Sequence, residues 1–206
     1  MQVYELATLT AATVGATGRF GPAISAFCAE DGARGRLLGT FVTEVGALNR
    51  VLVLRGFVDE AELRAERRRT QASTNPFGCA EWLGGMELDA YAPLDFVPPV
   101  ETGAFGPFYE VRTYVTRPNG LGPTIEAWRE QLPARRELSR LLVAMHTLDG
   151  PTRFTHIWPY PSMDTRAAIR ATAVERGIWP PRGGPTWLSP DMRSWVCTPL
   201  PGSPLT

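Results

Sequence analysis

Val-Tyr-Glu-Leu-Ala-Thr at residues 3–8 recurs as Phe-Tyr-Glu-Val-Arg-Thr at residues 108–113, an offset of 105 positions. The run at residues 50–57 recurs at residues 153–160 with an offset of 103. Shorter matches in the same order join residues 36–38 to 140–142 and residues 82–83 to 187–188. Four matches in one order indicate that a single structural unit occurs twice.

A stretch rich in proline and glycine separates the two copies. Residues 93–107 hold four prolines and two glycines, a composition typical of a linker. We therefore divide the chain into a first unit at residues 1–97, a linker at residues 98–106 and a second unit at residues 107–206. Each unit then has the size of one small domain.

Each unit shows the order strand, helix, strand, strand, helix, strand. Runs of β-branched and aromatic residues indicate the strands, and apolar residues at helical spacing indicate the helices. The expected strands are 3–9, 37–45, 50–57 and 86–92, then 108–115, 141–148, 153–160 and 192–197. The expected first helices are 19–34 and 123–137, and the second helices run from the N-caps Asp59 and Ser162 to about residues 72 and 176.

This order is the split βαβ motif, a four-stranded sheet with both helices on one face. The other face is bare, and two such faces can cover each other. We therefore predict an α+β fold in which two tandem ferredoxin-like βαββαβ units pack sheet to sheet as an intramolecular α+β barrel.

Composition excludes several classes of partner and chemistry. Lys+Arg 21 against Asp+Glu 21 leaves no net charge, so we expect no nucleic-acid or membrane partner. Every basic residue is arginine, which excludes lysine imine chemistry. No basic leader or long apolar run occurs, and we expect a cytoplasmic protein that could form a homo-oligomer.

Three motifs resemble those of the NIPSNAP family. Residues 109–114, Tyr-Glu-Val-Arg-Thr-Tyr, are similar to the family's Tyr-Glu-Leu-Arg-Thr-Tyr, and residues 156–160, His-Ile-Trp-Pro-Tyr, to its His-Leu-Trp-x-Tyr before a helix. Residues 39–49 correspond to its strand with a Gly-Pro-Leu-Asn-like turn. The resemblance covers nearly the whole chain and implies the dimeric α+β barrel superfamily, which includes monooxygenase-like enzymes, haem-binding chlorite dismutase relatives and binding proteins. It implies no single reaction.

Strand alternation predicts one polar cluster in the second unit. Glu110, Arg112 and Tyr114 share one face of the first strand, and we expect this face to line the barrel lumen, with the alternate residues under the helices. Phe154, His156 and Trp158 are expected to face the lumen from the paired strand. We predict His156, Glu110, Arg112 and Tyr114 as catalytic residues. We predict Trp158, Phe154, His146, Arg55 and Glu5 as substrate-binding residues.

The predicted function is a cofactor-independent enzyme acting on a small apolar or aromatic metabolite by proton transfer. His156 or Glu110 would move the proton, and Arg112 would stabilise negative charge. The alternative is a non-catalytic small-ligand-binding or protein-interaction module, with Glu110 and Arg112 as a structural ion pair. We expect no metal, because no carboxylate completes a site with His146 and His156. No cofactor is expected either, and haem bound through His156 is the alternative.

Two tryptophans occupy the same place in both copies. Trp82 and Trp187 each precede the last strand of a unit. We expect both to be mostly buried core anchors.

Overall fold

The computed structural model describes residues 1–183 and 186–206 in full, and residues 184 and 185 only as part of a helix. The strands of the first unit are β1 (Val3–Ala11), β2 (Arg36–Val45), β3 (Arg50–Phe57) and β4 (Leu83–Pro93). The strands of the second are β5 (Phe108–Thr116), β6 (Val143–Thr147), β7 (Arg153–Tyr160) and β8 (Leu188–Pro199). The helices are η1 (Ala16–Arg19), α1 (Phe20–Cys28), α2 (Glu60–Ala72), η2 (Pro76–Gly78), α3 (Leu121–Arg136), α4 (Met163–Glu175) and α5 (Gly184–Trp187).

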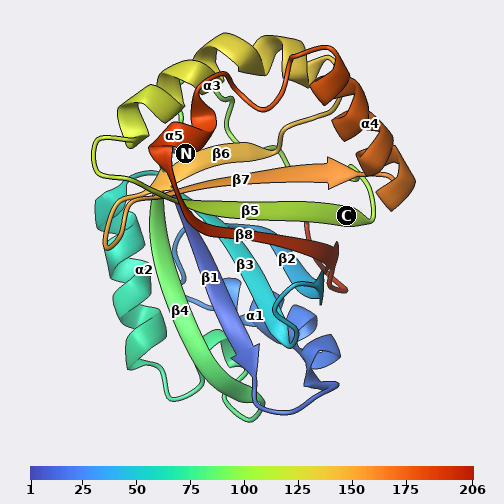
Figure 1. Ribbon diagram of the computed structural model, residues 1–206. Helices are drawn as coiled ribbons and strands as arrows, with labels where there is room; N and C mark the ends of the chain where they lie inside the picture. Colours follow the sequence, from blue (N-terminus) through green and yellow to red (C-terminus); the bar gives the residue numbers. More distant parts are fainter.

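The strands form one closed antiparallel barrel in the order β1-β3-β2-β8-β5-β7-β6-β4. Each unit contributes four neighbouring strands, and the units join where β2 pairs with β8 and β4 pairs with β6. Figure 1 shows α3 and α4 outside the β5–β7 part of the wall, and α1 and α2 outside the first unit's part. The predicted fold class is therefore confirmed.

Local signals account for the ends of the helices. The Asp59 side chain accepts a hydrogen bond from the Glu62 N–H, and Ser162 accepts one from the Thr165 N–H, so both predicted N-caps are confirmed. Helix α1 is shorter than predicted and ends at Cys28. The chain after it turns at Gly32, whose φ of 83° favours glycine.

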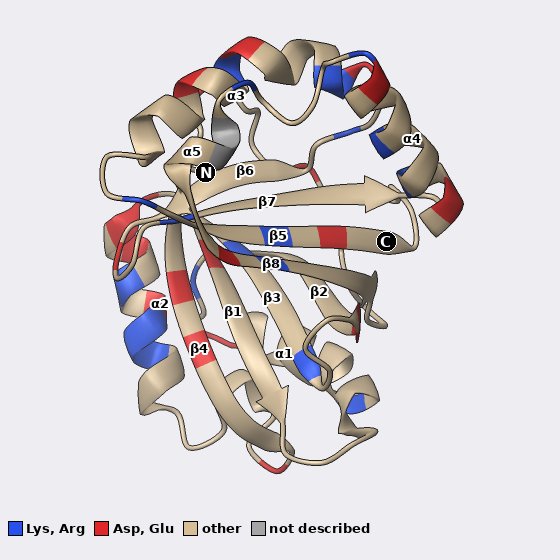
Figure 2. Cartoon of the chain, in the orientation of Figure 1, with Lys and Arg blue, Asp and Glu red and all other residues tan. Residues whose placement is uncertain are grey.

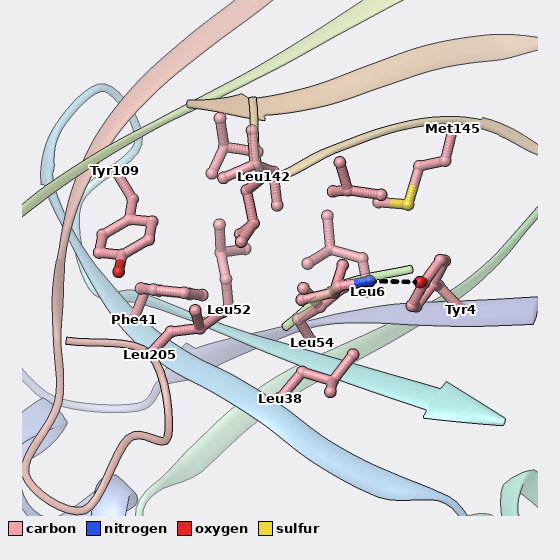
Figure 3. Close-up of a cluster of buried hydrophobic side chains, with 14 of the residues drawn as sticks. Tyr4, Leu6, Leu38, Phe41, Leu52, Leu54, Tyr109, Leu142, Met145 and Leu205 are labelled. Carbon is pink, nitrogen blue, oxygen red and sulfur yellow. Dashed lines mark hydrogen bonds between the residues drawn. The ribbon is translucent and has the colours of Figure 1, made fainter. Parts of the chain in front are cut away.

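Apolar side chains form the main cluster of the barrel interior. Figure 3 shows Tyr4, Leu6, Phe41, Leu52 and Tyr109 pointing toward one another between the strands. The Tyr4 hydroxyl accepts a hydrogen bond of 3.0 Å from the backbone N–H of Val100. Both units contribute to this cluster, which explains why the two sheets stay together.

The predicted direction of the site residues was wrong. Tyr109, Val111 and Ile157 belong to the interior cluster, so the alternate residues of β5 and β7 face outward, toward α3 and α4. Both faces of the barrel wall are covered, the inner by the opposite strands and the outer by helices. Polarity alone therefore does not decide which set of side chains faces inward. The predicted lumen site is replaced by a site outside the wall.

Trp82 and Trp187 are both half-buried; Trp82 packs against a core cluster as expected, whereas Trp187 lines the cavity described below and does not anchor the core. Trp82 packs beside the first unit's outer cluster with the Arg19 guanidinium 5.4 Å from its ring centre. Trp187 lies at the end of α5, beside α3. None of the helices in the described part of the chain combines the length and apolarity needed to cross a membrane.

Candidate functional site

A cavity of about 260 Å³ lies between the outer face of the second unit's strands and helices α3 and α4. Arg112 and Tyr114 of β5 and His156 of β7 form its floor, and Arg112 and His156 are direct partners across the two strands. The tyrosine and imidazole rings are 5.4 Å apart. The structure thus brings three of the four predicted catalytic residues to one cavity, though not to the lumen.

Aromatic side chains enclose this cavity, called the second-unit pocket below. Trp128 of α3 packs with its ring centre 4.8 Å from that of His156, and Trp179 meets Trp128 edge-on at 4.7 Å. Trp187 and Met192 line the pocket farther out. The walls are suited to a flat apolar ligand.

His156 is held by its neighbour Trp158. The indole Nε1–H donates to Nδ1 of His156 at 2.7 Å, and His156 is 2% exposed. Burial, followed by the charges of Arg112, Arg170 and Arg135, lowers the pKa of His156 well below its ordinary value. The imidazole is therefore neutral, with its proton on Nε2, and Nε2 has no hydrogen-bond partner among the described residues.

This arrangement changes what His156 can do. A general base needs a free nitrogen lone pair, and the lone pair of the neutral ring is engaged by Trp158. The other ring nitrogen, Nε2, carries the proton. His156 therefore has a buried N–H donor without a partner among the described residues, and it has no lone pair available to accept a proton.

Glu110 lies beside the pocket in a cluster of arginines. One of its carboxylate oxygens accepts hydrogen bonds from Arg166 and, at 3.1 Å, from the Ser194 hydroxyl. Guanidinium nitrogens of Arg112 and Arg170 lie 3.6 and 3.9 Å from the carboxylate. Burial alone would raise the pKa of Glu110, but the Arg166 hydrogen bond and the three positive charges outweigh it, so the pKa is lowered. Figure 2 shows the acidic and basic positions side by side on β5.

Arg135 is a further pocket residue, on α3. It is 2% exposed, donates to the Ser139 hydroxyl at 2.5 Å and to the Tyr160 hydroxyl at 3.3 Å, and stacks 4.4 Å from the Trp158 ring centre. Burial lowers its pKa. Sequence reasoning missed Arg135 and Trp128, although their spacing of seven residues places them on one helix face. Arg170 of α4 was missed as well, because no local pattern separates it from solvated arginines.

The remaining predicted ligand-contacting residues lie apart from the pocket. Phe154 and Trp158 are buried behind its floor, and they support His156 and Trp128. His146 is half-buried at the end of β6, with Nδ1 3.3 Å from the Thr147 carbonyl, and is not among the pocket residues. Glu5 and Arg55 are buried beside α2 of the first unit and do not line the pocket, so the structure does not bring these predicted substrate-binding residues to the site.

The first unit fills the equivalent space. Ala7 and Val53 pair across β1 and β3 as Arg112 and His156 do across β5 and β7, and they pack with Phe20 and Phe77 in an apolar cluster. Glu5 and Arg55 form a buried ion pair beneath α2, in which the Arg55 guanidinium also contacts Glu66 at 2.9 Å. The two copies have thus diverged into a packed unit and an open one.

The pocket does not fit haem. Coordination through His156 requires an open face as broad as a porphyrin, and Trp128 and Tyr114 cover the imidazole at 4.8 and 5.4 Å. No group of three or more His, Cys, Asp or Glu side chains able to hold a metal ion occurs among the residues that the structure describes.

Fold and site together define a single-chain α+β barrel of two ferredoxin-like halves, with a ligand-sized pocket outside the second half. The chain belongs to the NIPSNAP family, whose sequence profile matches residues 3–78 and 109–204. A NipSnap homolog of Dictyostelium discoideum is 25% identical over 145 residues, which are 69% of this chain and 65% of that protein. The chain thus spans just under two thirds of that relative's length.

Solved structures share the fold over nearly the whole chain. An anthrone oxidase-like protein aligns with a TM-score of 0.66 and 13% identity, covering 97% of this chain and 91% of the other. A candidate monooxygenase of Lactobacillus acidophilus NCFM aligns with a TM-score of 0.65 and 10% identity over 98% of both chains. At these identities the likeness concerns the fold alone.

Proposed function

We propose that this protein is a small-molecule-binding barrel whose ligand, a compact aromatic metabolite, occupies the second-unit pocket. The observation that carries the proposal is the difference between the two copies. The same place in the fold is packed with apolar side chains around Ala7 and Val53 in the first unit, and it is an aromatic-walled cavity above Arg112 and His156 in the second. A cavity that is present in just one of the two copies supports a ligand-binding role for that copy.

The polar floor supports binding over the proton-transfer mechanism expected from the sequence. Arg112 and the Nε2–H of His156 are hydrogen-bond donors, and burial raises the pKa of Tyr114, which keeps its phenol protonated. Glu110 is ionised and engaged by Arg166. A base free to remove a substrate proton is absent from the described lining residues.

A matched pair of substitutions on α4 tests the pocket. Ala173 is buried and lines the cavity, whereas Ala171, two residues earlier, is exposed. We expect Ala173→Phe to fill the cavity and abolish binding of aromatic probes such as 2-naphthoate, and Ala171→Phe to leave binding unchanged. Tryptophan fluorescence quenching reports binding directly, because Trp128 and Trp179 line the pocket. Equal binding by both folded variants would refute the proposed location.

A second candidate function is cofactor-independent catalysis at the same place. Donors that converge on one point can stabilise negative charge that develops on a substrate oxygen. The shared fold with an anthrone oxidase-like protein makes an enolisable aromatic ketone a suitable trial substrate. Oxygen consumption with anthrone, measured for the wild type and for Arg112→Met, distinguishes this candidate from binding alone. If neither protein consumes oxygen faster than anthrone does in buffer alone, the catalytic candidate fails and the binding function remains.

A further inference from the structure

Arginine is the residue that carries charge in the second-unit pocket. Its described lining includes Arg112, Arg135 and Arg170, and no aspartate or glutamate lines it. Two neutral donors add to this set: the buried Nε2–H of His156, which has no partner among the described residues, and the protonated phenol of Tyr114. A pocket that offers donors and positive charge selects a ligand that brings acceptors and negative charge.

Of the pocket arginines, Arg135 most needs a bound anion as its counter-ion. Its guanidinium is almost fully buried, and its hydrogen-bond partners are the neutral hydroxyls of Ser139 and Tyr160. It takes part in no ion pair among the described residues, and its Nε has no hydrogen-bond partner. A buried cation without a counter-ion is costly, and a bound anion at the pocket would offset that cost.

Arg112 also has an N–H donor without an acceptor among the described residues. It is 3.6 Å from Glu110, beyond an ordinary hydrogen bond, because Arg166 and Ser194 occupy that carboxylate at shorter range. Its Nε is buried without a partner among the described residues. One carboxylate thus stands against the positive charges of Arg112, Arg166 and Arg170, which leaves an excess of positive charge beside the floor.

The indole N–H of Trp158 completes the argument. By occupying Nδ1 of His156 it excludes the tautomer that could accept a hydrogen bond from a ligand. A neutral ligand with a donor at this end, such as an amide, would place an N–H group against an N–H group. A carboxylate matches all the donors, and its two oxygens suit the planar fork of an arginine.

We infer, taking the proposed ligand pocket as the starting point, that the ligand is a planar aromatic carboxylate. Its ring lies against the wall that Trp128 and Trp179 form together, and its charged oxygens face Arg112, Arg135 and the Nε2–H of His156. The arginines determine the specificity for charge, and the tryptophans determine the specificity for a flat ring.

Two isosteric probes separate charge from shape. 2-Naphthoate and 2-naphthamide share the ring and nearly the same outline, and only the first is an anion at pH 7.5. Isothermal titration of the full chain is expected to show naphthoate binding roughly ten- to a hundredfold more tightly, as charge-assisted hydrogen bonds require. Arg112→Met and Arg135→Met should reduce naphthoate binding by a similar factor and leave naphthamide binding nearly unchanged.

Controls keep the charge inference separate from the pocket proposal. Arg64→Met removes an exposed arginine of the first unit and should leave both affinities unchanged. Naphthoate should raise the melting temperature of the wild type and of Arg64→Met, and it should raise that of Arg135→Met much less. The same melts show whether Arg135→Met folds. If Arg135→Met does not fold, His156→Gln provides a second test. If naphthamide binds as tightly as naphthoate, the carboxylate inference is wrong and the pocket remains. If neither probe binds, and 2-methylnaphthalene does not bind either, the pocket proposal fails too.

Discussion

Trp158 donates its indole N–H to Nδ1 of His156 at 2.7 Å, and the two residues stand two positions apart on the same outer face of β7. The position of this single proton determines the chemistry of the pocket floor. With Nδ1 engaged, the neutral imidazole carries its hydrogen on Nε2 and faces a ligand as a donor. Burial, and then the charges of the arginines around it, lower the pKa of His156 and keep the ring from taking a second proton.

Replacement of the indole donor should change the tautomer of His156. In the wild type we expect the Nε2–H form, seen in the nitrogen chemical shifts of the ring. Trp158→Phe keeps an aromatic ring but removes the donor, so the two neutral tautomers should become mixed and naphthoate binding should weaken. Trp128→Phe removes an indole that has no hydrogen bond to His156 and should leave the tautomer unchanged. A wild-type ring protonated on Nδ1 would contradict the hydrogen bond.

Acid should destabilise the protein through His156. Its pKa in the folded protein lies below the unfolded value of about 6.5, so the unfolded chain binds a proton first as the pH falls. The contribution to stability is complete above pH 6.5 and declines below it. Urea unfolding at pH 7.5 and 5.5 should show a larger loss for the wild type than for His156→Gln, which does not titrate. Equal losses for the two proteins would show that His156 is not the group responsible.

Glu110→Gln should affect stability and binding in opposite directions. The carboxylate is 1% exposed and compensates Arg112, Arg166 and Arg170, so its neutralisation should cost about 3 kcal/mol of unfolding free energy. The same change leaves more positive charge beside the pocket and should tighten naphthoate binding. Glu60→Gln breaks an exposed pair and should change neither by a measurable amount. Weaker naphthoate binding by folded Glu110→Gln would argue against an anionic ligand.

Replacement of Trp82 and replacement of Trp187 should have different effects on ligand binding. Both are half-buried, so Trp82→Ala and Trp187→Ala should each cost about 1–3 kcal/mol, less than the 3–5 kcal/mol of a fully buried tryptophan. Trp187 lines the pocket and Trp82 does not, so Trp187→Ala alone should weaken ligand binding. Thermal melts and fluorescence titration measure the two effects. Loss of binding in Trp82→Ala would contradict the asymmetry of the units.

Fragments of the chain test the proposed division into units. Residues 1–97 and 107–206 each contribute one side of the interior cluster, so either fragment alone would expose apolar side chains such as Leu52 or Ile157. We expect the isolated fragments to bind a hydrophobic dye or self-associate, and a mixture of the two to form a stable complex. Analytical ultracentrifugation and dye fluorescence measure this. A fragment that is monomeric and cooperatively folded would show that the units are independent.

The sequence was sufficient for the repeat, the order of strands and helices, both N-caps and the closure of the barrel. These features depend on local patterns, such as the N-caps Asp59 and Ser162 before helical segments, and on the requirement that two bare sheet faces be covered. Strand alternation also grouped Arg112 with Tyr114 correctly, because a period of two is a property of the extended backbone itself. The hairpin then placed His156 opposite Arg112.

Which of the two groups faces inward was decided by the tertiary structure alone. In this barrel both faces of the wall are buried, so Val111 and Ile157 meet the opposite strands, whereas Arg112 and His156 meet the helices. A sequence pattern shows that two sets of residues point apart, but the choice between them depends on how the side chains of both units fill one interior. The isolation of Arg135 likewise arises from the packing of α3 against β7, which no local pattern encodes.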